Sequence, residues 1–328
     1  MNGATLNLAL TGVGLHCPLG PTAAAACATM RAKLNRFEDL VFFDDAPYKY
    51  VGSFVPEITD VLPSLRAAAL LDGALRDLTQ SWPDPRLLDR IPMVLAIPDY
   101  GTNFERTVID RLPRRPEMIV HGGSTTGLEL LAEAARLLEH GSSHVLVCAA
   151  DSRVTGRGLL ALRESGRLRR QSAPQGVIPG EAAACVLVEP ARPDTIHIAA
   201  LGRGVEPATF ANDLPLQAEG LTAAWRRALG AAQRELDDID WHIADHGDES
   251  FFVKQHEMAL TRLLTQSRPN IPRWQPTDFM GDVGTATGLV EIIWAAQAWA
   301  RGYAPGAAAL CSCSDAGGGR AAVIIARE

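Results

Sequence analysis

Two kinds of apolar pattern alternate along the chain. Short apolar runs are typical of buried strands, and longer segments with apolar residues every three or four positions are typical of helices. The short runs predict strands at 6–12, 92–97, 117–121, 144–150, 185–189, 197–201, 241–244, 307–312 and 321–326. The longer segments predict helices at 21–34, 64–78, 128–139, 221–235, 253–264 and 289–301. Strands that alternate with long helices predict an α/β fold with buried, mainly parallel sheets.

One segment of the chain is echoed later in the sequence. Gly-Ser-Thr-Thr-Gly-Leu at 123–128 and Gly-Thr-Ala-Thr-Gly-Leu at 284–289 share one pattern at an offset of 161 (284 − 123). At the same offset Gly141 corresponds to Gly302, so in both copies an alanine-rich helix ends at a glycine. An offset of about half the chain suggests a duplication into two similar halves. Chance similarity of two Gly/Thr-rich helix starts is the alternative.

The composition excludes two classes of partner. Thirty-one Lys and Arg residues against 38 Asp and Glu residues give a net charge of −7. Nucleic acids and anionic membranes both require a basic surface field, so neither is expected as a partner. No apolar run approaches the ~18 residues of a membrane span. No basic segment precedes the first apolar stretch, so a signal peptide is not expected.

The cysteines carry no metal-site spacing. Only Cys311 and Cys313 are close in sequence, and no histidine cluster accompanies them. We therefore expect neither a metal site nor a cofactor. Buried, reduced thiols of a cytoplasmic protein are the expected state of all six cysteines. These are Cys17, Cys27, Cys148, Cys185, Cys311 and Cys313.

Five segments, in order over nearly the whole chain, resemble the β-ketoacyl synthases of the thiolase superfamily. They are the opening strand and glycine turn at 10–20, the helix and strand at 134–151, the Pro-Gly-Glu-Ala strand at 179–189, the Asp-His-Gly turn at 245–247 and the Gly-Asp segment at 281–291. The resemblance implies a five-layer αβαβα fold with two pseudo-symmetric halves. We expect the halves at residues 1–190 and 191–328.

The resemblance fails at the positions that carry the family's chemistry. By alignment, Ser124 stands in place of the nucleophilic cysteine, Asp282 in place of one catalytic histidine and Thr277 in place of a lysine. His246 alone keeps the family's residue type. The segment between Ile97 and Ser124, which carries part of the acyl tunnel and of the dimer contact in chain-elongating synthases, is much shorter. The glycine loop at 314–319 lacks the family's aromatic residue.

These changes remove the groups that decarboxylative condensation requires. A serine hydroxyl ionises far above neutral pH, whereas a cysteine can supply a thiolate, so Ser124 needs an adjacent base. Decarboxylation also needs two neutral donors at the enolate oxygen, supplied in the family by paired histidines. An ionised Asp282 opposes the negative charge that develops there. We therefore expect no carbon–carbon bond formation.

Two interpretations of Ser124, His246 and Asp282 remain open. They can form a Ser-His-Asp arrangement that acts on a thioester or ester, because the family geometry brings these positions together. Alternatively, Ser124 caps a helix, His246 is a hydrogen-bonded turn histidine, and Asp282 accepts from backbone N–H groups. Asp245 and Asp248 flank His246 and can hold it as a base.

Three further features have mainly structural interpretations. His121 can be a base or a bonded histidine at the end of a strand. The arginine-rich run 163–170 can meet an acidic acyl carrier protein or be a solvated loop. The glycines at 317–319 form a tight turn and, without a following helix, give no dinucleotide signal.

Three functions follow as alternatives. The first, which the sequence favours, is a synthase-like adaptor that has lost condensation and binds a protein partner. The second is an acyltransferase or hydrolase that uses Ser124, His246 and Asp282. The third is the non-catalytic subunit of a ketosynthase heterodimer. The Gly-Asp-Val-Gly segment and the chain length also resemble synthase-like proteins of type VI secretion clusters. We therefore expect an acyl carrier protein or a secretion-related protein as partner, and a homodimer or heterodimer.

Overall fold

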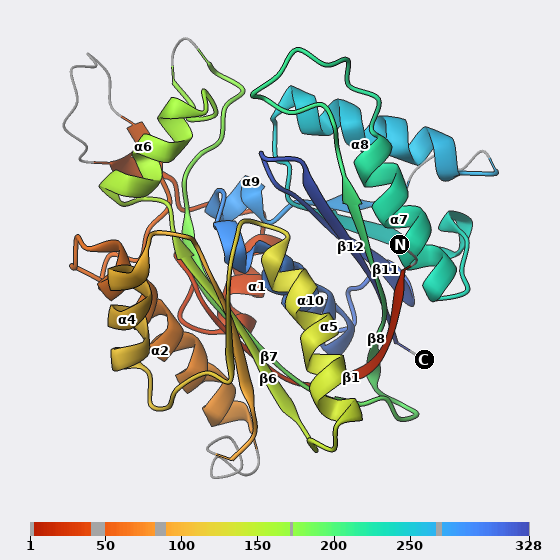
Figure 1. Ribbon diagram of the computed structural model, residues 1–328, viewed down its shortest axis with the longest axis horizontal. Coiled ribbons are helices and arrows are strands. Elements are labelled where there is room, and N and C mark those ends of the chain that lie inside the picture. Colours follow the sequence, from red (N-terminus) through yellow and green to blue (C-terminus); the bar gives the residue numbers. More distant parts are fainter. Residues whose placement is uncertain (1–2, 41–49, 83–89, 171–172, 267–270, 328) are drawn as a thin grey trace.

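The computed structural model describes residues 3–40, 50–82, 90–170, 173–266 and 271–327 (Figure 1). Its strands are β1 (Ala4–His16), β2 (Glu38–Leu40), β3 (Tyr50–Gly52), β4 (Met93–Ile97), β5 (Met118–His121), β6 (Val145–Ser152), β7 (Glu181–Pro190), β8 (Ile196–Val205), β9 (Trp241–Ala244), β10 (Arg273–Trp274), β11 (Ala308–Ser314) and β12 (Gly319–Arg327). Its helices are α1 (Ala23–Arg31), α2 (Pro63–Ser81), α4 (Thr102–Arg111), α5 (Thr126–Glu139), α6 (Gly156–Glu164), α7 (Glu219–Ala231), α8 (Ser250–Leu263), α9 (Thr277–Met280) and α10 (Thr287–Ala300). Two 3-10 turns are η1 (Leu236–Asp238) and η2 (Gly284–Ala286).

The main sheet has two halves with the same strand order. Its sequence of strands is β10-β9-β11-β12-β8-β1-β7-β6-β4-β5, and β1 joins β8 to β7 at the centre. From the centre outward, β1, β7, β6, β4 and β5 match β8, β12, β11, β9 and β10, and the corresponding pairs run in the same relative directions. Both ends of α5 lie 161 residues before those of α10. The duplication read from the sequence is therefore present in the topology.

The prediction of mainly parallel sheets is wrong. In the described part of the chain, β4 and β9 pair in parallel with their neighbours, but β1, β7, β8 and β12 pair only antiparallel. A strand buried on both faces reads as an apolar run whatever its direction, so the pattern alone cannot distinguish the two cases. The resulting sheet is mixed.

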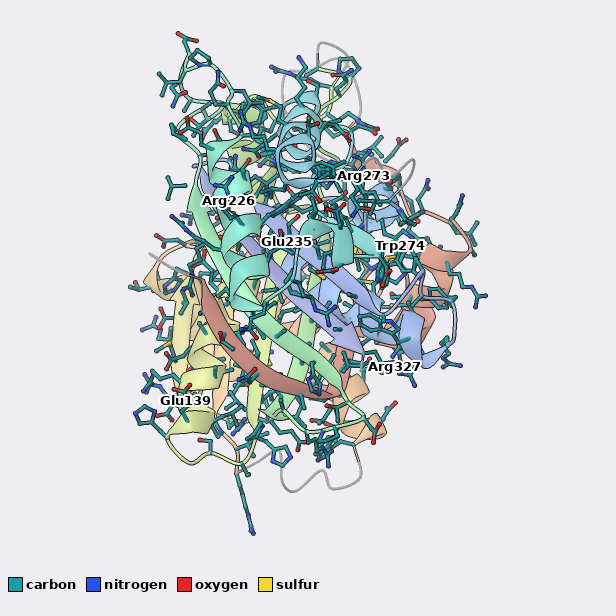
Figure 2. All side chains as sticks on the ribbon, turned by 90° about the vertical axis from the view of Figure 1, so that its right-hand side faces the viewer. Glu139, Arg226, Glu235, Arg273, Trp274 and Arg327 are labelled. Carbon is teal, nitrogen blue, oxygen red and sulfur yellow. The ribbon has the colours of Figure 1, made fainter. Side chains whose placement is uncertain are left out.

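Helices cover the sheet halves on the outside and also fill the space between them. α5 and α10 lie at the centre of the molecule, with α2 and α4 on one side and α7 and α8 on the other (Figure 1). The largest cluster of buried apolar residues packs α1, α5 and α10 between the two halves, and separate clusters lie under α2 and under α7. Figure 2 shows α7, which carries Arg226, on the outer face of the C-terminal half. These five layers confirm the predicted fold class.

The sequence pattern missed three helices near the site: α4, α6 and the four-residue α9. α4 buries only Phe104 and Val108, and α6 is nine residues long and begins at Gly156, so neither has a broad apolar stripe. The expected division at residue 190 falls where β7 ends, and five residues separate it from the start of β8 at Ile196. In the residues that the structure describes, no helix has the length and apolar character needed to cross a membrane.

Candidate functional site

Ser124 lies in the turn between β5 and α5. The residue is 7% exposed, but the hydrogen bonds at the start of α5 are made by its neighbour. Thr125 donates its backbone N–H to Asp315 Oδ1 at 3.3 Å and its hydroxyl to Asp315 Oδ2 at 2.7 Å. Asp315 comes from the turn between β11 and β12, so the C-terminal half supplies the carboxylate at this helix terminus. This placement also suits the positive end of the helix dipole.

His246 lies in the turn that follows β9. Its Nδ1 lies 3.0 Å from the carbonyl oxygen of Gly247 and 3.1 Å from Gln275 Nε2, while its Nε2 is buried with no hydrogen-bond partner among the described residues. Burial lowers the pKa of His246 to about 4, so the ring is neutral at pH 7. Neither flanking carboxylate holds it, because Asp245 accepts from the backbone N–H of Ser314 and Asp248 pairs with Arg169.

Asp282 belongs to a buried set of charged side chains. Its Oδ1 accepts from the backbone N–H of Gly284 at 2.9 Å, and its Oδ2 accepts from Arg153 Nη1 at 2.6 Å and lies 3.7 Å from Arg167 Nη2. Arg167 also forms a two-point pair with Glu249, at 3.0 and 2.7 Å. These four residues and Asp151, whose Oδ2 lies 3.5 Å from Arg153 Nε, are called the ion-pair network below.

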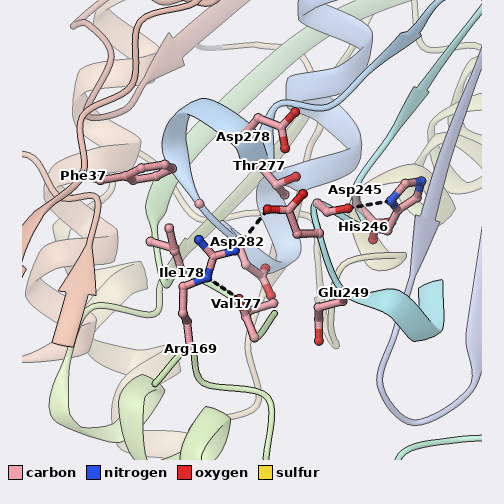
Figure 3. Close-up of a pocket in the computed structure, with 14 residues that line it drawn as sticks. Phe37, Arg169, Val177, Ile178, Asp245, His246, Glu249, Thr277, Asp278 and Asp282 are labelled. Atoms are coloured by element: carbon pink, nitrogen blue, oxygen red, sulfur yellow. Dashed lines mark hydrogen bonds and ion pairs between the residues drawn. The ribbon is translucent and has the colours of Figure 1, made fainter. Parts of the chain in front are cut away.

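The ion-pair network separates Ser124 from His246. His246, Glu249 and Asp282 line a cavity of about 200 Å³, shown in Figure 3. Ser124, Arg153 and Arg167 line a second cavity of about 440 Å³. Arg153 and Arg167 therefore face the serine cavity, whereas Asp282 and Glu249 face the histidine cavity. Asp151, the second partner of Arg153, lines the serine cavity. Among the described residues, Ser124, His246 and Asp282 make no hydrogen bond with one another.

In the ion-pair network, interactions between opposite charges offset part of the cost of burying each charge. Burial raises the pKa of Asp151 to about 6; nearby Asp282 raises it further and Arg153 opposes the rise. Although burial alone would lower the pKa of Arg167, its hydrogen bonds and charge interaction with Glu249 raise the pKa above the usual value. Bidentate arginine–carboxylate pairs are the strongest of the charge-assisted hydrogen bonds. The arrangement stabilises fixed charges, and among the described residues no hydrogen bond joins its carboxylates to Ser124.

The other groups expected from the resemblance supply no replacement chemistry. Thr277 lines the histidine cavity, and its hydroxyl is buried without a hydrogen-bond partner in the described part of the chain. Burial raises the pKa of the Cys17 thiol to about 12, and it raises those of Cys311 and Cys313 well above the usual range. All six cysteines are buried, so none is a nucleophile at this surface. Among the described residues, no three or more His, Cys, Asp or Glu side chains are placed so that they could hold a metal ion together.

Two further sequence candidates have other partners. His121 Nε2 lies 3.1 Å from Glu105 Oε2 at an exposed position. In the arginine-rich run, Arg167 belongs to the network, and Arg169 donates to the Gly176 carbonyl and pairs with Asp248. The run is therefore partly committed to contacts inside this molecule.

Of the network, sequence reasoning found Asp282 and the arginine-rich run that contains Arg167, but it missed Arg153, Asp151 and Glu249. Arg153 and Arg167 stand close after β6 and α6, but their carboxylate partners are 129 and 82 residues away in sequence. The available signal for these two residues was their position: Arg153 directly follows an apolar strand, and Arg167 follows a short helix close to it in sequence. The pairing itself depends on the tertiary structure.

Replacing Asp315 with Ala is expected to lower the free energy of unfolding by about 0.5–2 kcal/mol. The substitution leaves the backbone N–H and the hydroxyl of Thr125, the residue just before α5, without this acceptor. Ser124→Ala is the matched control, and we expect it to change stability by no more than about 0.5 kcal/mol. Urea denaturation of both variants measures the difference. A larger loss for Ser124→Ala than for Asp315→Ala would contradict this account of the helix terminus.

Comparison with known proteins gives a result at the level of structure only. No family model matches the sequence, and no curated protein matches it. The structure is similar to the ishigamide ketosynthase/chain length factor, with 20% identity, a TM-score of 0.72 and 99% of each chain covered. The chain has a thiolase-like ketosynthase fold.

Two other solved structures share this ketosynthase fold. One is the complex AntDE:AntF, a type II PKS acyl-carrier protein with its ketosynthase bound to the hexaketide, at 13% identity and a TM-score of 0.79, covering 99% of this chain and 100% of that chain. The other is the ketosynthase ApeO in complex with its chain length factor ApeC from Xenorhabdus doucetiae, at 13% identity and a TM-score of 0.77, covering 98% of each chain. Structural similarity at such low sequence identity establishes the ketosynthase fold alone, so the activity has to be argued from the site.

Proposed function

We propose that this chain is a non-condensing subunit that pairs with a ketosynthase-like partner chain. The observation that carries the proposal is the ion-pair network, which occupies the space between Ser124 and His246. An acyl enzyme would need the Ser124 hydroxyl within about 3.2 Å of a base, and an oriented base behind it. The neighbouring charges are instead fixed in mutual pairs. Of the three functions considered from the sequence, the heterodimer subunit is therefore favoured over the acyltransferase or hydrolase.

The solved structures that resemble the chain support a protein partner over an isolated enzyme. Two of them are named for a chain length factor, and one is a ketosynthase complex with an acyl carrier protein. The chain also has an edge strand available for pairing, because β5 ends the sheet. Its residues Met118, Ile119 and Val120 are half-buried and apolar. An exposed strand edge of this kind can pair with a second chain.

An adaptor role, including one beside a type VI secretion system, also requires a protein partner. The identity of that partner distinguishes the adaptor from the heterodimer subunit. A thiolase-fold chain with a cysteine nucleophile supports the heterodimer, and a secretion component supports the adaptor.

Affinity purification of the tagged full-length chain from its own cells tests the proposal. We expect a stoichiometric complex with a second thiolase-fold chain, and no β-ketoacyl product when the purified chain alone is given acyl and malonyl carriers. Ser124→Ala is expected to leave the complex and its product yield unchanged, because no side chain of the described residues is hydrogen-bonded to the Ser124 hydroxyl. Recovery of the chain without any such partner would contradict the heterodimer, as would a β-ketoacyl product above the no-enzyme background.

A further inference from the structure

Three histidines form a buried cluster behind the turn that carries His246. His242 on β9, His246 and His256 on α8 are 2%, 5% and 2% exposed. The ring centroids of His242 and His256 are 5.4 Å apart, and those of His246 and His256 are 5.0 Å apart. Trp225 of α7 packs edge-on against both His242 and His256, at 5.1 and 4.9 Å. We call His242, His246 and His256 the histidine cluster.

The hydrogen bonding of the cluster suits neutral rings. His242 Nδ1 lies 3.4 Å from His256 Nε2, so one nitrogen donates and the other must accept. In the described part of the chain, His256 Nδ1 and His246 Nε2 are buried without a hydrogen-bond partner. An added proton would turn an accepting nitrogen into a second donor, or place an N–H where no acceptor is present. Either result leaves a buried charge unpaired.

The charges around His246 and His256 do not compensate for a proton on either ring. Arg273 of β10, labelled in Figure 2, disfavours a positive charge on His246 and His256, although it pairs with Glu257 of α8 at 2.7 Å. Asp248 favours a charge on His246 but is itself paired with Arg169. In the same turn, Asp245 and Glu249 are bonded to Ser314 and Arg167. Burial, then the neighbouring imidazoles, lowers the pKa of His256 well below its usual value.

The turn from 245 to 249 links the histidine cluster to the ion-pair network. The backbone N–H of Glu249 donates to the carbonyl of His246 at 3.3 Å, and Glu249 stands immediately before the first residue of α8. The Glu249 carboxylate holds Arg167 at the wall between the two cavities. A displacement of this turn therefore moves a member of each group.

We propose that the histidine cluster is an acid-operated latch that holds the turn 245–249 and the start of α8 closed. When one imidazole takes up a proton, the turn and the helix start move away from β9, and the charged ring gains access to water. Glu249 then releases Arg167, and the serine and histidine cavities become continuous. This inference does not rest on the proposed function, because it concerns the opening of the wall and not the partner.

Hydrogen–deuterium exchange of the full-length chain tests the latch. Exchange is followed at about pH 7.5 and pH 5, with the labelling times corrected for the chemical pH dependence of amide exchange. We expect peptides covering 241–263 to open about tenfold more at the lower pH, while peptides of α2 keep their protection. His256→Gln is expected to reduce this acid response at least by about half, and His140→Gln, at an exposed position, is the matched control.

The outcomes of this experiment are distinct. If residues 241–263 gain no more exchange than α2 in the wild type, the latch is wrong whatever the variants do. An acid response in His256→Gln equal to that of the wild type would also overturn it. If His256→Gln does not fold, His246→Gln provides the same comparison. Asp245→Asn is expected to keep the response, and its loss there would assign the opening to the carboxyl group and not to the histidines.

Discussion

Replacing Arg167 with Met is expected to lower the free energy of unfolding by about 3–5 kcal/mol. The substitution leaves Glu249 without its two-point partner and removes the second cation near Asp282, with both carboxylates almost completely buried. An uncompensated buried charge costs far more than the net contribution of the intact pair. Adding Glu249→Leu to Arg167→Met should therefore restore much of the lost free energy of unfolding. Urea denaturation followed by tryptophan fluorescence measures all three proteins.

The control for Arg167 lies two residues further along the chain. Arg169 pairs with Asp248, whose side chain is 76% exposed, so Arg169→Met should cost no more than about 1 kcal/mol. Equal losses for Arg167→Met and Arg169→Met would show that the network does not carry buried charges. A double variant no more stable than Arg167→Met would show that Glu249 is not left unpaired by that change.

Glu181→Ala is expected to cost a similar amount, about 3–5 kcal/mol, at a different place. Glu181 is fully buried at the start of β7, where its carboxylate accepts from Arg66 of α2, from the backbone N–H of Val55 and from the Ser152 hydroxyl. Removing it leaves the buried Arg66 guanidinium without a counter-charge, with only backbone carbonyls as acceptors, and leaves the Val55 N–H and the Ser152 hydroxyl without this acceptor. The expected result is a lower midpoint of unfolding in urea.

An exposed ion pair on α2, the helix that carries Arg66, is the control for Glu181→Ala. Arg76 and Asp72 form an i,i+4 pair with side chains 67% and 59% exposed, so Asp72→Ala should cost only about 0.3–0.5 kcal/mol. If Glu181→Ala unfolds at the same urea concentration as Asp72→Ala, the buried position of the Arg66–Glu181 pair is not reproduced in solution.

Much of the fold could be predicted from the sequence because burial leaves a periodic pattern. The strand 241–244 is the same in prediction and structure, and the echo at offset 161 marks two corresponding helices. The direction of β1, β7, β8 and β12 could not be predicted, since strands covered on both faces have no polar face to set a register. α4 was missed because only two of its residues are buried.

The site was only partly predictable, for a reason that concerns charge. Alignment with the synthase motifs located Ser124, His246 and Asp282, and the turn chemistry of Asp282 matches one of its two predicted roles. The partner of Asp282 is Arg153, which lies 129 residues away in sequence, so the sequence could not show whether Asp282 faces a histidine or an arginine. Sequence spacing carries no information on such contacts, so the ion-pair network appears only once the halves are packed together.

Covalent labelling of Ser124 tests most directly the claim that this chain has lost acyl chemistry. The wild-type protein and Ser124→Ala are incubated with an activated ester and with an acyl thioester, and the intact masses are measured. Because the ion-pair network stands between Ser124 and His246, we predict no acyl adduct on either protein. One acyl group per wild-type chain, absent from Ser124→Ala, would contradict the account and assign the chain to the acyltransferases or hydrolases.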